Sequence, residues 1–588
     1  MAIFITSDPH KTAVINTKMI SLASRSTHIF LITILIVIAG FLRIYKIATV
    51  PPGLNQDETA IGYNAYSILV TGRDEWGEKY PLYFKSFGDY KLPIYIYITS
   101  LFVKIFGLNE YAVRLPSAVA GTVAVPLLFL LTNLLTRKIS LSFFSALLLA
   151  ITPWHIQFSR SGFEVNFALT AAMLGVFLFI LSVTKKNSFL LISSLMAFSI
   201  CLYSYNQTRL LSPLLLVSVI ALNKKKLIAM EPKKLLFALI VFTITLLPFF
   251  LSFFSGEGIF SAKSALILSS DTKAKVIELR SYANLLPDLY LKLFYNKYIN
   301  IAFQYFQNLA LLFSGEFFFV KGSPHPNQGI GNAGLLYLFQ LPLFIIGVVI
   351  FLKNKRKELS VFGLWFLVSI FVLALSKEVP HATRGYFMVI PLTVFSASGL
   401  LYFANIIIRR LESDKLRVLI LLGAASFIFF NIQFYFISYY FRFPRTSARA
   451  WGTVDKDLSL FLSSVNSRYE KIIIDNETTF IYTTFLFYNR YPPLKFINEV
   501  VRFKDGDLYK ARTWGKYEIR SIDWKVDTAG PNNLIVSVEH HVPKDMPVLK
   551  YFYYPTRDVV LSVTGEIVQY PIDEKAYLLV ESNSVIGR

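Results

Sequence analysis

The sequence contains very little cysteine and few charged residues. Its single cysteine, Cys201, has no second thiol to pair with, which excludes an intramolecular disulfide and leaves the redox compartment undetermined. Only 16% of the 588 residues are charged, whereas 54% are hydrophobic and the mean hydropathy is +0.51. A soluble chain would have too few charges to cover its surface, but a polytopic chain can expose its surplus apolar residues to lipid. The composition therefore predicts a polytopic α-helical membrane protein.

Acidic residues are scarce relative to basic ones, 37 against 59, and the formal net charge is +22. The basic residues form separate clusters between hydrophobic segments, as in the cytoplasmic loops of membrane proteins. No basic-aromatic nucleic-acid module is present, so no nucleic-acid partner is predicted. The clusters are Arg137 and Lys138, Lys185 and Lys186, 224–226 with Lys233 and Lys234, 353–357, and Arg409 and Arg410 with Lys415 and Arg417.

Eleven apolar segments are long enough to be membrane spans, given a rise of about 1.5 Å per helical residue across about 30 Å of hydrocarbon. With Lys11, Lys18 and Arg25 placed in the cytoplasm, every basic cluster falls on the cytoplasmic side. The first span is long and is followed by others, so it is interpreted as a signal-anchor of a multi-pass cell-membrane protein. The spans lie near 28–47, 112–136, 139–154, 164–184, 188–205, 208–223, 234–254, 332–352, 359–376, 384–405 and 416–438.

This topology places most acidic residues and histidines of the membrane half in segments that face away from the cytoplasm. The main ones are a first outer loop at 48–111 and a long outer loop at 255–331. Nucleotide sugars are cytoplasmic, so an active site on the extracytoplasmic side must receive its substrates bound to lipid or transported across the membrane. We expect a catalytic membrane domain at 1–440 and a soluble extracytoplasmic α/β domain at 441–588, in which charge rises and strand-length apolar runs occur at 471–475, 516–524, 533–542 and 548–554.

The first outer loop carries the most informative residues. It reads PPGLNQDETAIGYNAY, then GDYKLPIYIY, then NEYAVRLPSAVAG. Charged groups cost several kcal/mol each inside a bilayer, so this loop is expected at the water interface, where it forms an active site. Asn55 is a suitable N-cap, which predicts a helix with Asp57 and Glu58 in its first turn, continuing to Val70 and ending at Gly72.

Several motifs resemble the GT-C glycosyltransferases of the protein O-mannosyltransferase and aminoarabinose-transferase superfamily, in particular its bacterial and archaeal branch. The sharpest element is the acidic pair Asp57 and Glu58, followed by Lys91 before Pro93. The likeness extends in order over about 440 residues. It also includes EYAVRLPSAVAG at 110–121, TPWHIQFSRSGFE at 152–164, GEFFFVKGSPHPNQGIGNAGLLYLFQLP and VPHATRGYFMVIPL.

The resemblance implies an enzyme that moves a sugar from a polyprenyl-phosphate carrier to an acceptor on the outer face, with inversion. Asp57 is then the base that orients the acceptor hydroxyl, and Glu58 is its acidic neighbour in the catalytic pair. Lys91 neutralises the charge on the departing phosphate. Arg114 matches the family's arginine at the foot of the second span, and the resemblance implies that it holds either the loop or the donor phosphate. The alternative, that Asp57 and Glu58 only cap a helix, is disfavoured because capping needs one acidic group.

Further candidates for donor and substrate binding are His381 and Arg384, which fall on one helical face, together with Arg209, Arg160 and Asp89. For the arginines the simpler interpretation is interfacial snorkelling or a salt bridge, and Arg160 with Glu164 has the spacing of such a pair. His325 and His155 are interpreted as loop or interfacial residues, because no second ligand stands at metal spacing. No cofactor and no metal site are therefore predicted, and a divalent-metal requirement as in the oligosaccharyltransferase branch finds no support in the sequence.

Two other classes of function share some of these features. A transporter or flippase of lipid-linked sugars has many spans, but it usually carries paired repeats and broken helices at mid-membrane, which this sequence does not show. A non-catalytic scaffold that displays the C-terminal domain needs no acidic pair and lysine in its first loop. The sequence names neither the sugar, for which mannose, glucose, aminoarabinose and other sugars are alternatives, nor the acceptor, which is a protein, a lipid or a cell-envelope glycan.

Overall fold

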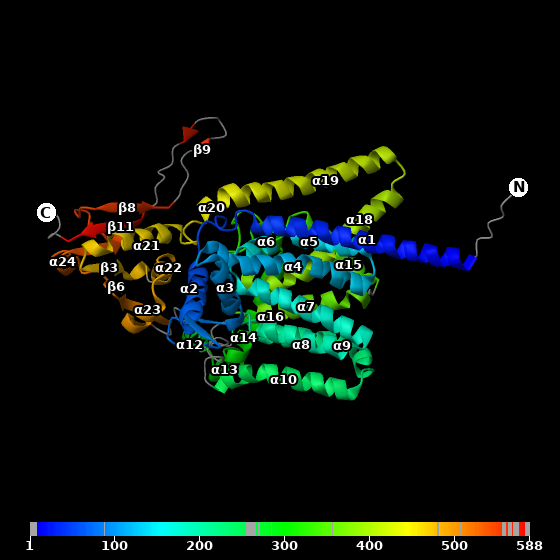
Figure 1. Cartoon of the computed structure of the whole chain (residues 1–588), viewed down its shortest axis with the longest axis horizontal. Helices are drawn as coiled ribbons and strands as arrows, with labels where there is room; N and C mark the ends of the chain where they lie inside the picture. The colour runs from blue at the N-terminus through cyan, green and yellow to red at the C-terminus, as the bar shows by residue number, and fades with distance from the viewer. Residues whose placement is uncertain are drawn as a thin grey trace.

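The structure is a computed structural model of the whole chain, and it places a long helical body beside a sheet-containing C-terminal region (Figure 1). It describes residues 9–86, 89–254, 266–267, 271–283, 285–354, 357–478, 481–505, 508–554, 560–561, 567–568 and 575–582. Within these ranges, the side chains of 9–25, 89, 252–254, 271–273, 478, 505, 508, 560–561 and 567–568 are not described.

The helical body is built from long apolar helices that lie roughly along one direction (Figure 1). Two of them, α5 and α6, are bent by 56° against each other at Thr152, which precedes a proline. The helices of this body are α1 (Pro9–Ile44), α4 (Glu110–Thr136), α5 (Ile139–Ile151), α6 (Pro153–Arg160), α7 (Glu164–Lys185), α8 (Ser188–Leu202), α9 (Thr208–Ile228), α10 (Pro232–Phe254), α15 (Gln340–Lys353), η2 (Lys357–Leu359), α16 (Ser360–Ala374), α17 (Ala382–Gly385), η3 (Tyr386–Met388), α18 (Val389–Arg410) and α19 (Asp414–Ile437).

Each of the eleven predicted spans overlaps a helix, but the number of spans is not confirmed. Seven helical segments of the described chain are long and apolar enough to cross a membrane, or eight if the bent pair α5 and α6 is one span. Two predicted spans, 188–205 and 332–352, correspond to the shorter apolar helices α8 and α15. The chain is thus a multi-pass membrane protein, and among its described residues fewer helices pass this test of length and hydropathy than the eleven apolar segments of the sequence.

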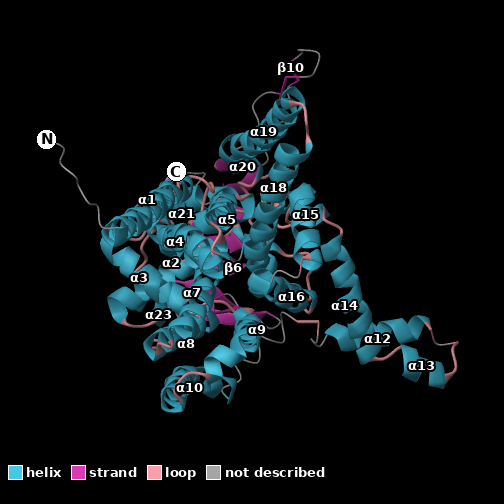
Figure 2. Cartoon of the chain, turned by 90° about the vertical axis from the view of Figure 1, so that its right-hand side faces the viewer, coloured by secondary structure: helices cyan, strands magenta, loops and turns pink. Residues whose placement is uncertain are grey.

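The two long outer loops are partly helical. The first contains α2 (Gln56–Thr71), the two-stranded antiparallel sheet β1 (Phe84–Ser86) and β2 (Asp89–Lys91), and α3 (Pro93–Phe106). The second carries α12 (Asp271–Tyr282), α13 (Asp288–Phe294), α14 (Lys297–Phe313) and the π-helix η1 (Glu316–Val320). The helices α12 and α13 extend from the side of the helical body (Figure 2).

The C-terminal region is built around a seven-stranded sheet of order β4-β5-β6-β3-β7-β11-β8. Its central strand β3 pairs in parallel with β6 and β7, and the outer pairs are antiparallel. The strands are β3 (Lys471–Asp475), β4 (Val501–Asp505), β5 (Leu508–Trp514), β6 (Tyr517–Arg520), β7 (Asn533–Ser537), β8 (Lys550–Tyr553) and β11 (Lys575–Glu581), with β9 (Val560–Leu561) and β10 (Ile567–Val568) as a separate pair.

Short helices flank this sheet, so the predicted α/β fold of the C-terminal region is confirmed. All four predicted strand segments contain a strand, whereas β4, β5, β9, β10 and β11 were not predicted. The proposed boundary at 440/441 falls inside the π-helix η4 (Ser438–Arg442). The helices are α20 (Phe443–Thr446), α21 (Thr453–Val465), η5 (Asn466–Arg468), η6 (Asn476–Thr478), α22 (Ile481–Tyr488), α23 (Pro493–Glu499), α24 (Trp524–Asp527) and η7 (Glu539–His541).

The first outer loop lies between the sheet region and the helical body (Figure 1). On α2, Ala60 and Tyr63 are fully buried in the same core as α21, α22 and the sheet. The Nζ of Lys456 on α21 lies 2.7 Å from Oε1 of Glu110 at the start of α4. Arg502 of β4 donates to the carbonyl of Glu75 at 2.6 Å. The C-terminal region therefore holds the first loop in place through apolar and charged contacts.

Candidate active site

The first turn of α2 presents the two acidic residues in opposite environments. Asn55 is the N-cap: its side chain accepts from the backbone N–H of Glu58, whose carboxylate accepts from the backbone N–H of Asn55. This capping box fixes the start of the helix. Gly72 ends it in the left-handed conformation, as predicted. Asp57 points outward with 37% of its side chain exposed, and Glu58 is fully buried.

Asp57 forms an ion pair with Lys91, the residue that the sequence motif singled out. Lys91 ends β2, and its Nζ lies 2.5 Å from Oδ1 of Asp57, with 4% of the lysine side chain exposed. The hairpin of β1 and β2 therefore delivers a nearly buried ammonium to the first turn of α2. A carboxylate and an ammonium thus lie side by side where the first loop meets the helical body.

Glu58 and Arg114 form a buried pair that connects the first loop to α4. The Nε of Arg114 lies 2.8 Å from Oε1 of Glu58, and both side chains are fully buried. Glu58 also accepts from the N–H of Gly162 at 2.8 Å. The Arg114 guanidinium donates to the carbonyls of Ile47, Pro51 and Gly53. Since protein groups satisfy both side chains, the geometry favours positioning of the loop over contact with a substrate.

Asp57 lies where two cavities meet. A smaller cavity of about 220 Å³ extends from Asp57 toward the helical body, and a larger one of about 820 Å³ extends toward the C-terminal region. Asn327, in the segment after η1, also lines both. One carboxylate can therefore contact molecules that enter from either side.

The smaller cavity gathers cationic and polar side chains. Arg384 is mostly buried, and its Nη1 is buried without a hydrogen-bond partner among the described residues. His381 is the N-cap of α17, where its Nδ1 accepts from the backbone N–H of Arg384 at 3.4 Å. Burial, together with the neighbouring Arg384, lowers the pKa of His381 to about 3, so this imidazole is neutral near pH 7. The lining also includes Tyr90, Lys91, Phe163, Glu164, Tyr205, Asn206 and Gln328.

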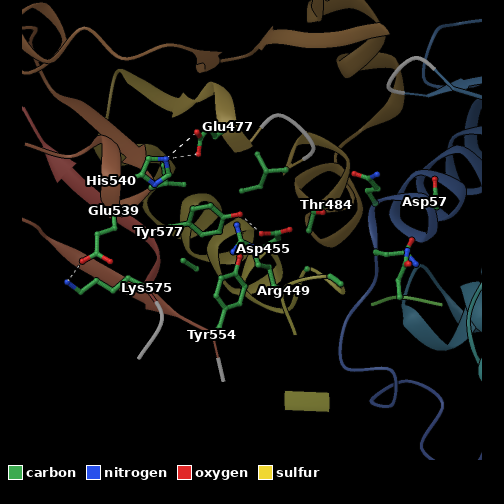
Figure 3. Close-up of a pocket in the computed structure, with 18 residues that line it drawn as sticks. Asp57, Arg449, Asp455, Glu477, Thr484, Glu539, His540, Tyr554, Lys575 and Tyr577 are labelled. Atoms are coloured by element: carbon green, nitrogen blue, oxygen red, sulfur yellow. Dashed lines mark hydrogen bonds and ion pairs between the residues drawn. The ribbon is translucent and has the colours of Figure 1, made fainter. Parts of the chain in front are cut away.

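The larger cavity has mixed charge with an excess of acidic groups. Figure 3 shows Asp57 on one side and Glu477, His540 and Lys575 on the opposite side. Burial raises the pKa of Asp455, which accepts a 2.6 Å hydrogen bond from the hydroxyl of Tyr577. Further lining residues include Asn55, Gln56, Arg449, Thr484, Glu539 and Tyr554.

Three other predicted site residues lie outside these cavities or outside the described side chains. Arg160 is buried, and its guanidinium donates to the carbonyls of Leu42 and Val50 at 2.8 Å each. The predicted pair of Arg160 with Glu164 is therefore wrong, and Glu164 lines the smaller cavity instead. Arg209 lies over the rings of Tyr83 and Phe249, at 5.1 and 5.6 Å. Asp89 belongs to β2, but its side chain is not described.

His325 has the neighbours that the sequence did not reveal. Its ring centroid lies 4.8 Å from that of His381, and Glu378 completes a group whose ligand atoms lie within 4.8 Å of one another. The expectation that His325 lacks a second ligand nearby is thus wrong. His155 is fully buried in α6, where its Nδ1 lies 2.5 Å from Nη2 of Arg43. It is a core residue and not an interfacial one.

Comparisons with known proteins find one family model and several similar structures. Residues 91–251 match the family model described as dolichyl-phosphate-mannose-protein mannosyltransferase. No curated protein matches the sequence. The structure resembles ArnT from Cupriavidus metallidurans in the apo state, with 13% identity, a TM-score of 0.51, and coverage of 96% of this chain and 99% of that one. The same enzyme bound to undecaprenyl phosphate gives 12% identity, a TM-score of 0.51, and coverage of 94% and 97%.

The chain also matches the oligosaccharyltransferase AglB from Archaeoglobus fulgidus, solved with an inhibitory peptide and a dolichol-phosphate. The identity is 14% and the TM-score 0.47, and the match covers 79% of this chain and 64% of that one. This chain thus spans just under two thirds of the length of AglB. The match to ArnT extends over nearly the whole of both chains. The fold of this chain is therefore similar to that of ArnT.

Proposed function

We propose that this protein transfers a sugar from a polyprenyl-phosphate carrier to an acceptor hydroxyl. The observation that carries the proposal is the position of Asp57 at the junction of two cavities, one lined by cations and the other open to the C-terminal region. A glycosyltransferase needs such a group between its donor and its acceptor. The structure of ArnT bound to undecaprenyl phosphate, which has a similar fold, supports a lipid-phosphate donor.

The smaller cavity is assigned to the sugar phosphate of the donor. Lys91 and Arg384 both line it, and the Arg384 guanidinium carries a buried N–H group without a partner among the described residues. A guanidinium and an ammonium that are both mostly buried stabilise a phosphate and the negative charge that grows on it as it departs. Neutral His381 adds a hydrogen-bonding group without adding repulsion to the neighbouring arginine.

The larger cavity is assigned to the acceptor. Its walls come from the start of α2 and from the C-terminal region, so an acceptor bound there presents a hydroxyl to Asp57. As the acceptor oxygen bonds to the anomeric carbon, its proton passes to the Asp57 carboxylate. The bond from the anomeric carbon to the phosphate oxygen breaks, and its electron pair leaves with the polyprenyl phosphate. Because the attacking and leaving oxygens lie on opposite sides of the carbon, the configuration inverts.

Donor binding has to separate the ion pair between Asp57 and Lys91. The two atoms lie 2.5 Å apart, which leaves no room for an anomeric carbon between the attacking and the leaving oxygen. An arriving phosphate attracts the ammonium of Lys91 and releases the carboxylate of Asp57 toward the acceptor. In the absence of donor, the ion pair with Lys91 thus keeps the Asp57 carboxylate in place. When the donor binds, the pair separates and the carboxylate is free to contact the acceptor.

Glu58 and Arg114 are assigned the task of holding the loop. Arg114 binds Glu58 and three backbone carbonyls of the segment before α2, so it fixes the approach of this segment to α4. A catalytic carboxylate must be placed within a fraction of an ångström, and buried supporting groups supply that precision. Within the acidic pair, Asp57 therefore acts on the acceptor hydroxyl, whereas Glu58 holds the loop in position.

The orientation that we propose follows from the basic clusters, with the N-terminus in the cytoplasm of a cell with a plasma or inner membrane. Both cavities and the C-terminal region then face outward. The transferred sugar is a hexose or a pentose, with mannose, glucose and aminoarabinose as the first donors to test. The acceptor is a protein, a lipid or a cell-envelope glycan.

Asp57→Asn in the purified full-length protein tests the proposal. Labelled polyprenyl-phosphate sugars are incubated with membrane extracts, and products are identified by mass. We expect transfer to fall at least 100-fold, since general-base assistance contributes about 10²- to 10⁴-fold. Protection by polyprenyl phosphate against thermal unfolding should persist in this variant and weaken in Lys91→Met. Asp288→Asn and Lys292→Met supply a matched control, because they alter an exposed lysine–aspartate pair 2.8 Å apart. Full transfer by Asp57→Asn would overturn the proposal.

A further inference from the structure

A second group of polar residues lies in the C-terminal region, at the edge of the sheet that faces the larger cavity. Glu477 belongs to η6, which directly follows β3, while His540 and His541 belong to η7, which follows β7. Because β3 and β7 are parallel neighbours, their carboxyl ends meet at the same edge. The possible ligand atoms of the three side chains all lie within 4.8 Å of one another.

A buried carboxylate orients one of the two imidazoles. Asp475, the last residue of β3, accepts at its Oδ2 from Nδ1 of His541 at 2.8 Å and from the hydroxyl of Ser537 at 2.7 Å. Only 3% of Asp475 is exposed. In metal sites, a carboxylate that accepts from one imidazole nitrogen fixes the tautomer and leaves the other nitrogen for the metal. Here the other nitrogen, Nε2 of His541, faces Glu477.

The distances around Glu477 match those of a tetrahedral metal site. Nε2 of His540 lies 3.2 Å from the Glu477 carboxylate, and Nε2 of His541 lies 3.6 Å from it. Metal–ligand bonds of about 2.0 to 2.1 Å in a tetrahedron put neighbouring ligand atoms about 3.4 Å apart. The Nε2 atoms of both imidazoles thus converge on one carboxylate, which is the arrangement of three ligands around a shared cation.

We propose that Glu477, His540 and His541 bind a divalent transition-metal ion of the Zn²⁺ class, with Asp475 orienting His541. Two imidazoles and one carboxylate suit Zn²⁺ rather than Mg²⁺ or Ca²⁺, which prefer oxygen ligands alone. Three protein ligands leave at least one coordination position open. Since Glu477 and His540 both line the larger cavity, the ion adds a Lewis acid to a wall that otherwise carries excess negative charge (Figure 3). The site does not depend on the proposed glycosyl transfer.

The other histidine group of the described chain is less suited to a cation. There, Nδ1 of His381 accepts from the backbone N–H of Arg384, which leaves the proton of the neutral ring on Nε2, the nitrogen that faces Glu378. The Arg384 guanidinium also lies 3.6 Å from the Glu378 carboxylate, so a metal ion would meet a fixed positive charge. His325 belongs to this group and therefore supplies a matched control.

The test uses the full-length protein in lipid nanodiscs, purified without a histidine tag. Zinc content is measured by elemental mass spectrometry, and Zn²⁺ binding by calorimetry. We expect one site in the wild type and in His325→Gln, and loss of that site in the double variant His540→Gln and His541→Gln. Both replaced side chains are at least 42% exposed, so the fold should survive, which thermal unfolding verifies.

A second variant separates metal binding from surface ion pairing. Asp475→Asn keeps all three ligands but removes the charge that orients His541, and loss of such a partner weakens metal binding about 10- to 100-fold. With Co²⁺ as the probe, the wild type should show the visible absorption bands of a low-symmetry site, and the double histidine variant should not. Zinc binding that is equal in the wild type and the double variant would overturn the proposal, as would the absence of a stoichiometric site in the wild type.

Discussion

Replacement of Glu58 by glutamine distinguishes a supporting role from a catalytic one. Glu58 is fully buried and accepts hydrogen bonds from Nε and Nη2 of Arg114 at 2.8 and 3.1 Å, from the N–H of Gly162 at 2.8 Å and from the N–H of Asn55 at 3.2 Å. The glutamine side chain keeps one acceptor oxygen but turns an NH₂ group toward other donors. It also leaves the Arg114 guanidinium buried without its counter-charge.

The magnitude follows from this burial. Removing one partner of a buried ion pair typically costs about 3–5 kcal/mol, because the remaining charge stays out of water. Asp57→Asn also removes the partner of a charge, since Lys91 is only 4% exposed, but Asp57 is 37% exposed, so water screens this pair more than the fully buried pair of Glu58 and Arg114. We therefore expect Glu58→Gln to lower the apparent melting temperature more than Asp57→Asn does, whereas Asp57→Asn should lower transfer more.

The assay is thermal unfolding of purified variants in detergent, followed by tryptophan fluorescence, together with sugar transfer at a temperature where each variant is folded. Transfer by the folded Glu58→Gln protein should exceed that of Asp57→Asn. The double variant Glu58→Gln with Arg114→Met should regain part of the lost stability, since no uncompensated charge remains. A Glu58→Gln protein with normal stability and abolished transfer would refute the supporting role.

Two further predictions concern the region around α2. Burial is the main cause that raises the pKa of Glu75 from 4.5 to about 7, so the contribution of Glu75 to stability is full below pH 4.5 and is lost as the pH rises through 7. The loss is worth up to about 3 kcal/mol at 1.36 kcal/mol per pKa unit. Glu75→Gln should remove this loss, which melting curves from pH 5 to 8 measure. In Gly62→Ala, the new Cβ would lie 2.4 Å from the ring of Phe487 and 2.8 Å from Val113, so overpacking should destabilise the protein by about 1–3 kcal/mol, while Gly423→Ala, with nothing within 4 Å, should not. An unchanged pH profile in Glu75→Gln, or equal melting temperatures for the two glycine variants, would contradict these expectations.

Local features were predictable from the sequence. The helix from Asn55 to Gly72 follows from its cap, its apolar face and its final glycine, all of which act within one or two turns. The strand Lys471–Asp475 matches its predicted bounds, because a run of isoleucines favours a buried strand. The membrane helices were predictable for a similar reason, since an apolar segment needs no distant partner to enter lipid. The short apolar helices were harder to classify, because length alone decides whether they span.

Distant pairings were not predictable. His325 meets His381, and Glu58 meets Arg114, in each case across 55 residues of intervening chain. Arg160 bonds to backbone carbonyls from an earlier segment, although Glu164 stands at helical spacing from it. The spacing of residues in a sequence predicts contacts within one helix or strand. A buried polar group instead forms its hydrogen bonds with the nearest suitable group, which often belongs to a distant part of the chain.

The sequence by itself determined that this is a multi-pass membrane protein with a GT-C-like first loop and an α/β C-terminal region, because composition, periodicity and caps are local properties. It also singled out Asp57 and Lys91. Only the tertiary structure decided that Asp57 stands between two cavities while Glu58 is buried against Arg114. Neighbouring residues on a helix point in different directions, and the surrounding elements determine which of them meets solvent and which meets the core.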